Sequence, residues 1–207
     1  MSKIQANQIQ HTQNGAAVFT LPTSDGSTGQ VMKTDGSGAL SFVAQPAAGI
    51  TEADQWRVTS NFTMGTTAAN ITSNWERNDT TAFEKIGTGM SVDSSTGRFT
   101  FPSTGIYLIS AFWQGQRATG NTYSGTVYMY GTTNNFSSNF SLMESWAGSG
   151  TNYELNNAYM SCIFDVEDTS THKCFVGYYD YHHGSMVFYG NTNTNYNAFT
   201  FIKLGDT

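Results

Sequence analysis

The chain has 207 residues and a formal net charge of −6 at pH 7, and charged residues make up 12% of it while aromatic residues make up 14%. Such a composition argues against a disordered chain, because it can bury enough apolar surface to offset the entropy lost on folding. The sequence contains no cluster of Lys and Arg, so we expect no nucleic-acid partner.

The sequence shows neither an apolar run typical of a signal peptide nor a segment of transmembrane length. We therefore expect synthesis in the cytoplasm and no membrane insertion. Cys162 and Cys174 are expected on neighbouring strands, as two buried reduced thiols or, alternatively, as a cross-strand disulfide. Two cysteines cannot complete a structural zinc site, and no cofactor is expected.

Residues 1–49 differ in residue pattern from the rest of the chain, because their apolar residues are scattered among Gln, Asn and Ala. Two Asp-Gly sequences, in SDGSTG and TDGSG, predict tight turns. The segment has too few apolar residues for a core of its own, so we expect it to attach to a partner. The residues predicted to make that attachment are Ile4, Ile9, Val18, Phe19, Leu21, Leu40 and Phe42.

Residues 21–43 read LPTSDGSTGQVMKTDGSGALSFV. This string resembles a segment of tail-fibre and other virion proteins of bacteriophages, especially phages of marine cyanobacteria, where it precedes a fibre shaft or a globular head. The resemblance implies that residues 1–49 bind phage capsid or tail proteins. Neither Asp-Gly turn has the alternating acidic residues and terminal Glu of a helix-loop-helix calcium site.

After a linker at residues 45–49, we expect one all-β domain over residues 50–207. Short apolar and aromatic runs, separated by turns rich in Gly and Asn, predict about ten strands and therefore a sandwich, jelly roll or barrel. The expected strands are Gln55–Asn61, Ala69–Trp75, Lys85–Val92, Gly97–Phe101, Ile106–Gln116, Tyr123–Tyr130, Asn139–Trp146, Asn157–Val166, His172–Asp180, Ser185–Tyr189 and Ala198–Leu204.

The stretch RFTFPSTGIYLISAFW, residues 98–113, holds two apolar runs separated by Pro102–Gly105. Proline cannot donate to a sheet and glycine accepts positive φ, so a tight corner is predicted with Gly105 at positive φ. The pattern Phe-x-x-Pro-x-x-Gly-x-Tyr, from Phe99 to Tyr107, resembles the signature of the complement-type globular heads, a family related to tumour necrosis factor. The aromatic strand Ala198–Leu204 is similar to the last strand of that family. The resemblance implies a ten-stranded jelly roll that forms a homotrimer, but no collagen repeat precedes it here.

Asp180-Tyr181-His182-His183 is the one sequence that suggests a metal site, since imidazoles bind metals readily. Neighbouring residues on a strand point to opposite faces, which favours a surface loop for His182 and His183. The alternative is a site in which three copies of one histidine meet on a trimer axis. No G-x-S-x-G, Walker or H-E-x-x-H motif and no marked pair of carboxylates is present, so no catalytic residue and no enzyme activity are predicted.

Most of the many tyrosines are expected in the core or in a subunit interface, whereas Trp146, Tyr153 and Tyr196 at loop tips are candidates to face a receptor. The function predicted from all of this is a bacteriophage virion structural protein, displayed at the virion surface as a capsid decoration, head fibre or short tail fibre. The alternative is a module that binds a host receptor or cell-surface glycan. A polysaccharide depolymerase is the third hypothesis.

Overall fold

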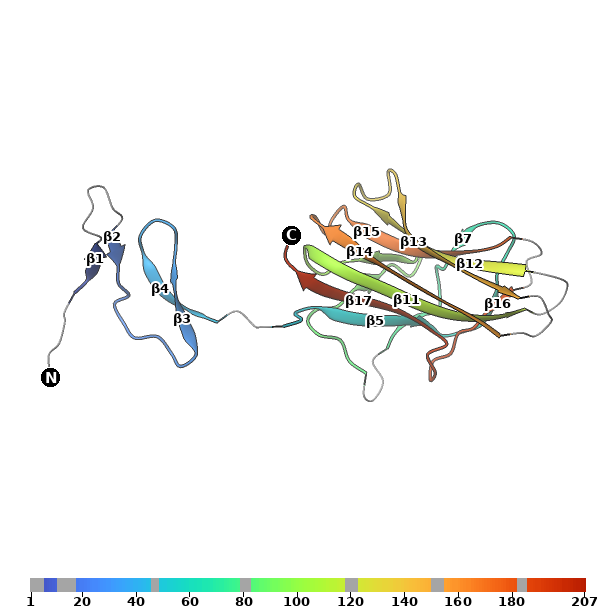
Figure 1. The fold of residues 1–207 in the computed structure, drawn as a ribbon, viewed down its shortest axis with the longest axis horizontal. Coiled ribbons are helices and arrows are strands. Elements are labelled where there is room, and N and C mark those ends of the chain that lie inside the picture. The colour runs from blue at the N-terminus through green and yellow to red at the C-terminus, as the bar shows by residue number, and fades with distance from the viewer. Residues whose placement is uncertain are drawn as a thin grey trace. The chain divides into compact units, whose positions relative to one another are not determined.

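The computed structural model describes residues 6–10, 18–45, 49–78, 83–117, 123–149, 155–181 and 186–207. It divides the chain into two compact units, Met1–Gly49 and Ile50–Thr207 (Figure 1). None of the described segments forms a helix with the length and hydropathy of a membrane span.

The N-terminal unit consists of two β-hairpins. β1 (Gln8–Gln10) pairs with β2 (Val18–Thr20), and β3 (Gln30–Thr34) pairs with β4 (Leu40–Ala44). The second hairpin turns at the predicted TDGSG sequence, where Asp35 Oδ1 accepts the N–H groups of Ser37 at 2.8 Å and Ala39 at 3.0 Å. The first hairpin was not predicted, because its strands have only three residues each, too few for an alternating pattern to stand out.

No described side chain of the N-terminal unit is buried within the chain. Ile9 is 55% exposed, Met32 50% and Phe19 38%. The hairpins are therefore held by backbone hydrogen bonds and turn contacts, including one from the Thr20 N–H to the Gly38 carbonyl at 2.8 Å. Exposed apolar side chains on a unit without a core agree with the expectation that these residues need a partner.

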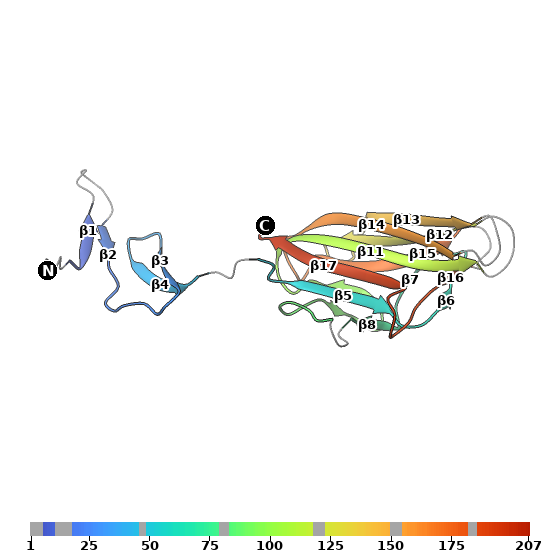
Figure 2. The same ribbon diagram turned by 60° about the horizontal axis from the view of Figure 1, so that its bottom comes forward.

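The second unit, called the head below, is a sandwich of two antiparallel sheets (Figures 1 and 2). The β12 sheet has the order β13-β12-β15-β10-β9, with β7 beside β15, and the β11 sheet has the order β6-β16-β11-β17-β5-β8, with β14 beside β11. The strands are β5 (Ala53–Val58), β6 (Phe62–Thr63), β7 (Ala69–Asn70), β8 (Trp75–Arg77), β9 (Ser91–Val92), β10 (Arg98–Thr100), β11 (Gly105–Arg117), β12 (Tyr123–Thr132), β13 (Phe140–Ser149), β14 (Leu155–Val166), β15 (Lys173–Asp180), β16 (Met186–Phe188) and β17 (Asn197–Gly205). This all-β architecture confirms the predicted fold class.

Three of the expected strands extend well beyond the observed ones, and the one expected over Gln55–Asn61 ends at Val58. Of Lys85–Val92 only Ser91–Val92 is a strand, and the strand expected over Ala69–Trp75 ends at Asn70. Gly87, with φ of 73°, and Asn74, with φ of 62°, interrupt the extended backbone in these segments. The short strands β6 and β8 were not predicted.

The predicted corner is present between β10 and β11. It carries the chain from one sheet to the other, and Gly105 has φ of 143°. The Tyr107 hydroxyl donates a hydrogen bond to the Ser103 carbonyl at 3.0 Å and so closes the corner. Phe99 and Phe101 on the other side of the turn are buried in the core.

Aromatic side chains fill the space between the two sheets. The Phe99 ring lies edge-on to Trp75, with centroids 5.0 Å apart, and 5.3 Å from the Phe201 ring. Trp113 is fully buried, and its Nε1–H donates to Ser145 Oγ at 2.9 Å, which joins β11 to β13 across the sandwich. Along β11, the side chains of Tyr107, Ile109, Ala111 and Trp113 therefore point into the core.

Both cysteines are free thiols. Cys162 lies on β14 and Cys174 on β15. These strands follow one another along the chain but belong to different sheets, so the expectation of neighbouring strands in one sheet was wrong. The turn between β14 and β15 crosses the edge of the sandwich and does not form a hairpin.

Candidate functional site

The outward side of the β11 sheet carries a row of apolar side chains. On β11, Tyr107 and Ile109 point into the core, and so Leu108 and Phe112 point outward. The strand register places Ile163 of β14 and Ile202 of β17 on either side of Leu108. The set that we call the apolar face consists of Leu108, Phe112, Tyr159, Ile163, Ile202 and Leu204.

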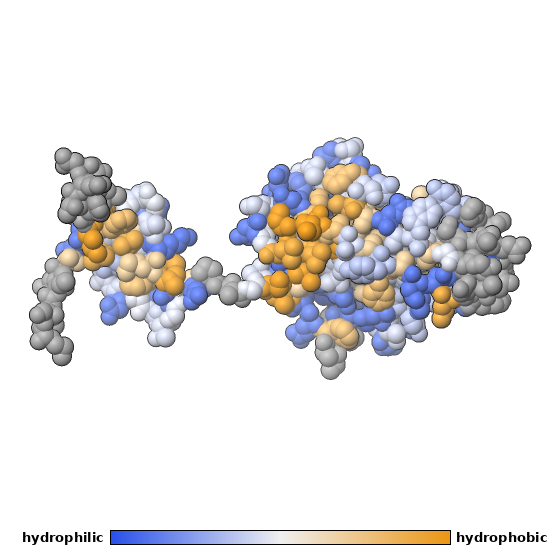
Figure 3. Space-filling model, in the orientation of Figure 1, coloured by the Kyte–Doolittle hydropathy of each residue, from blue (hydrophilic) through white to orange (hydrophobic). Residues whose placement is uncertain are grey.

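Much of the apolar face is open to solvent. Tyr159 is 68% exposed, Ile163 65% and Leu204 51%. Figure 3 shows hydrophobic residues gathered at the end of the head where β17 finishes at the C-terminus. A contiguous apolar surface on one layer of a folded domain is typical of a protein interface.

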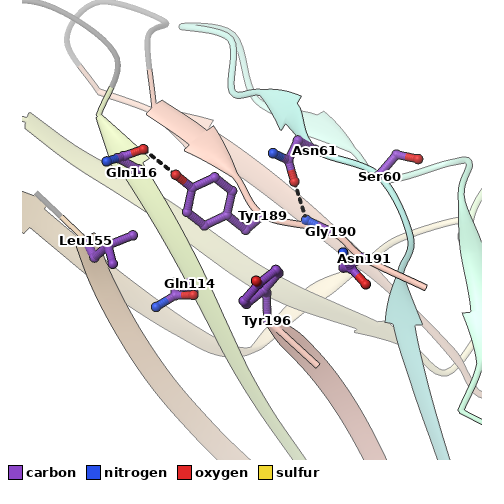
Figure 4. A pocket seen from close by; sticks show the side chains of 9 residues that line it. All are labelled: Ser60, Asn61, Gln114, Gln116, Leu155, Tyr189, Gly190, Asn191 and Tyr196. Carbon is purple, nitrogen blue, oxygen red and sulfur yellow. Dashed lines mark hydrogen bonds between the residues drawn. The ribbon is translucent and has the colours of Figure 1, made fainter. Parts of the chain in front are cut away.

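The outward row becomes polar toward the other end of β11. Gln114 lies opposite Asn157, and Gln116 lies opposite Leu155. Here β16 ends at Phe188 and β17 begins at Asn197, and the intervening loop leaves a pocket of about 670 Å³ beside β11 (Figure 4). The pocket is lined by Ser60, Asn61, Gln114, Gln116, Leu155, Tyr189, Gly190, Asn191 and Tyr196.

Tyr189 is fixed at the base of this loop by three hydrogen bonds. Its N–H donates to the Gln114 carbonyl at 3.0 Å, and its hydroxyl donates to Gln116 Oε1 (Figure 4). Its own carbonyl accepts from Asn197 Nδ2 at 2.9 Å. The ring position is therefore set by β11 on one side and by the start of β17 on the other.

The next residue, Gly190, lies against the backbone of Ser60. A Cβ at this position would come within 2.5 Å of the Ser60 nitrogen and oxygen, so only glycine permits the close approach. The Gly190 N–H donates to Asn61 Oδ1 at 2.9 Å (Figure 4). These contacts join the loop to the segment between β5 and β6.

An ion pair between a buried arginine and a partly exposed glutamate holds the far side of the loop. Arg57 Nε donates to Glu76 Oε2 at 2.8 Å, and Arg57 Nη1 donates to Asn195 Oδ1 at 3.0 Å. The Thr192 hydroxyl donates to Glu76 at 2.9 Å. The Arg57 side chain is only 2% exposed, so its charge is covered by the loop and does not face the pocket.

Two tyrosine rings and the Leu155 side chain form the apolar part of the pocket. The rings of Tyr189 and Tyr196 have centroids 5.8 Å apart and an angle of 50° between their planes. Tyr196 is 38% exposed. The remaining lining is made by neutral amide, hydroxyl and backbone groups, so the arrangement suits hydrogen bonding to an uncharged ligand and offers no acid, base or nucleophile pair for catalysis.

No family model and no curated protein matches the sequence. Among solved structures the chain is similar to the TNF protein Eiger from S. frugiperda, with 11% identity, 77% of this chain and 96% of that chain covered, and a TM-score of 0.54. It is also similar to murine APRIL at pH 5.0, with 11% identity, 74% and 98% coverage and a TM-score of 0.50. The head is a TNF-like jelly roll. This confirms the fold implied by the corner at Pro102–Gly105, and identities this low carry nothing beyond the fold.

The TNF-like head separates the residues that were predicted to face a receptor. Tyr196 lies in the pocket, whereas Trp146 is 50% exposed on the β12 sheet, with its ring 4.8 Å from that of Tyr181. Tyr153 lies outside the described residues. Their contact with a receptor stays a prediction.

The candidate metal ligands His182 and His183 also lie outside the described residues. Within the described parts, no group of three or more His, Cys, Asp and Glu side chains comes close enough to hold a metal ion. Ile4 of the predicted attachment set lies outside the described residues too, and the other members of that set are partly or well exposed.

Sequence reasoning missed Gln114, Gln116, Asn61 and Tyr189 as a group. One signal was available, because the outward positions of β11 change from apolar residues to two glutamines at its end. If another protein covered the whole outward side of β11, apolar residues would be expected along its full length.

Proposed function

We propose that this protein is a bacteriophage virion structural protein. Three copies form a surface appendage, in which residues 1–49 attach to capsid or tail proteins and the TNF-like heads are displayed on the particle. A capsid decoration, a head fibre and a short tail fibre all fit this description.

The observation that carries the proposal is the contrast between the two units. The head has a complete aromatic core, whereas the N-terminal unit exposes Ile9, Phe19 and Met32 and buries no described side chain. A segment of this kind gains stability by placing its apolar residues in grooves of a partner or by adding strands to a partner's sheet. The resemblance of residues 21–43 to a segment of phage virion proteins supports a particle as that partner.

The apolar face supports association of the heads. Exposed side chains such as Ile163 and Tyr159 gain about 25 cal/mol for each Å² of apolar surface that a neighbouring copy removes from water. The corner signature supports three copies, since the heads that it resembles are trimers. A ring of three closes on itself, so association stops at three copies. Three attachment segments on one trimer also increase the effective affinity for the particle.

Deletion of residues 1–45 tests whether the N-terminal unit, and not the head, attaches the protein to the particle. The truncated chain should remain a folded trimer by light scattering and should be absent from purified particles by immunogold labelling and immunoblot. Residues 1–49 fused to an unrelated trimeric protein should bring that protein to the particle. A truncated head present at full occupancy would show that the head itself docks, and a full-length chain absent from particles would refute the virion role.

A further inference from the structure

We infer that the pocket at the polar end of the β11 sheet binds a neutral saccharide. One hexopyranose ring would lie with the tyrosine pair on one side and the amide groups on the other. The inference rests on the geometry of the pocket (Figure 4) and holds whether or not the protein is part of a virion.

The absence of charge in the lining determines the class of ligand. No Lys, Arg, Asp or Glu is among the lining residues. A phosphate, sulfate or carboxylate ligand would lose its hydration without gaining an ion pair or a charge-assisted hydrogen bond. A ligand that is rich in hydroxyl groups and uncharged has no such cost.

The amide groups supply hydrogen bonds for hydroxyl groups. The Gln114 side chain makes no hydrogen bond with another described residue, so both its carbonyl oxygen and its NH₂ group remain to bind a ligand. Asn61 uses its Oδ1 for the Gly190 N–H and keeps its NH₂ group. A side-chain amide offers a donor and an acceptor side by side, and a pair of adjacent sugar hydroxyls presents the same combination.

The tyrosine rings supply the apolar contact. The rings of Tyr189 and Tyr196, with centroids 5.8 Å apart and planes at 50°, pack against each other and together form one aromatic wall of the pocket. A pyranose ring has one face made largely of C–H groups, which can lie against the exposed Tyr196 ring while its hydroxyl edge reaches Gln114. An aromatic ring with a polar group at one end suits such a half-wet site.

The pocket is formed before a ligand binds. Tyr189 is held by three hydrogen bonds, Gly190 by the Ser60 backbone contact and Asn195 by Arg57. A ligand therefore orders few additional side chains, which lowers the entropic cost of binding. The volume of about 670 Å³ lies in the range of small-ligand sites.

The same polar lining separates the pocket from the apolar face. Burying Gln114 against a neighbouring copy without a hydrogen-bond partner is unfavourable, whereas Leu108 and Phe112 on the same strand gain from burial. The change along β11 from apolar residues to glutamines is therefore expected where self-association ends and ligand binding begins.

Saturation-transfer difference NMR on the full chain tests the inference with glucose, galactose, mannose and N-acetylglucosamine as probes. We expect at least one of them to bind with a Kd of about 1 mM, typical of a single ring held by a few contacts. Glucuronate should bind more weakly than glucose, because no cation lines the pocket. Failure of all four neutral probes to bind, or equal binding of glucuronate, would overturn the inference.

Substitutions in the full chain locate the site. Tyr196→Ala and Gln114→Met should each weaken binding of the best probe by about tenfold, while Tyr196→Phe, which keeps the ring, should bind like the original protein. Phe83→Ala is the matched control, because it removes an exposed aromatic ring that does not line this pocket.

All variants should keep the oligomeric state and the melting temperature of the original protein. If Tyr196→Ala does not fold, Gln114→Met decides, since methionine matches the length of glutamine and removes only the amide. Unchanged affinity in a folded Gln114→Met variant would place the saccharide outside this pocket.

Discussion

Gly105 at the corner between the two sheets is a position where one added side chain should have a large local effect. Its φ of 143° is accessible to glycine and rarely to residues with a Cβ. A Cβ there would also overlap the Lys203 side chain and come within 2.5 Å of the Gly205 carbonyl oxygen. We therefore expect Gly105→Val to destabilise the head.

The magnitude follows from these contacts. A non-glycine residue in this backbone conformation costs about 1–3 kcal/mol. The Lys203 side chain is only 11% exposed, so moving it aside adds to this cost, although its ion pair with the exposed Asp206 contributes little. The Gly205 oxygen belongs to the backbone of β17, which is paired with β11, so it cannot move without disturbing the sheet.

Thermal unfolding followed by circular dichroism measures this cost. For a domain of this size, a loss of about 1–3 kcal/mol lowers the melting temperature by about 2–12 °C. The variants must be compared at one protein concentration, because the stability of an oligomer depends on it.

Gly205→Ala is the matched control. It adds a methyl group to a neighbouring glycine whose Cβ position has no atom within 4 Å, and it should melt like the original protein. A Gly105→Val variant with an unchanged melting temperature would refute the reasoning, since it would mean that the backbone at the corner relaxes freely.

Two further predictions concern the association of the heads and the thiols. Ile163→Glu places a carboxylate in the centre of the apolar face, and light scattering at micromolar concentration should then show monomers in place of trimers. Trp146→Glu, on the other sheet, should leave the trimers intact. Trimers that persist in Ile163→Glu would exclude the apolar face as the interface. Burial raises the pKa of Cys174 far above the usual thiol value, with a smaller contribution from Cys162, and burial also raises the pKa of Cys162. Both thiols should therefore stay protonated at pH 8. They should react with a thiolate-specific reagent much more slowly in the folded protein than in urea. Rapid reaction of the folded protein would contradict their burial.

The sequence by itself determined the features that depend on neighbouring residues. Pro102 and Gly105 restrict the backbone whatever surrounds them, and the corner is where they predict it. Asp35 bonds to N–H groups only a few residues away, so the TDGSG hairpin could be predicted as well. The apolar run also predicted a long strand over Ile106–Gln116, because its aromatic and β-branched residues favour extended backbone.

Only the tertiary structure decided what lies on the outside of the β11 sheet. Asn61, Gln114 and Tyr196 come from three distant segments, and they meet because β16 ends beside β11 before β17 begins. The sheets to which Cys162 and Cys174 belong could not be predicted from the sequence either, since consecutive strands can pair in one sheet or cross to the other. Strand register between distant segments is set by the packing of the whole core, and no local pattern encodes it.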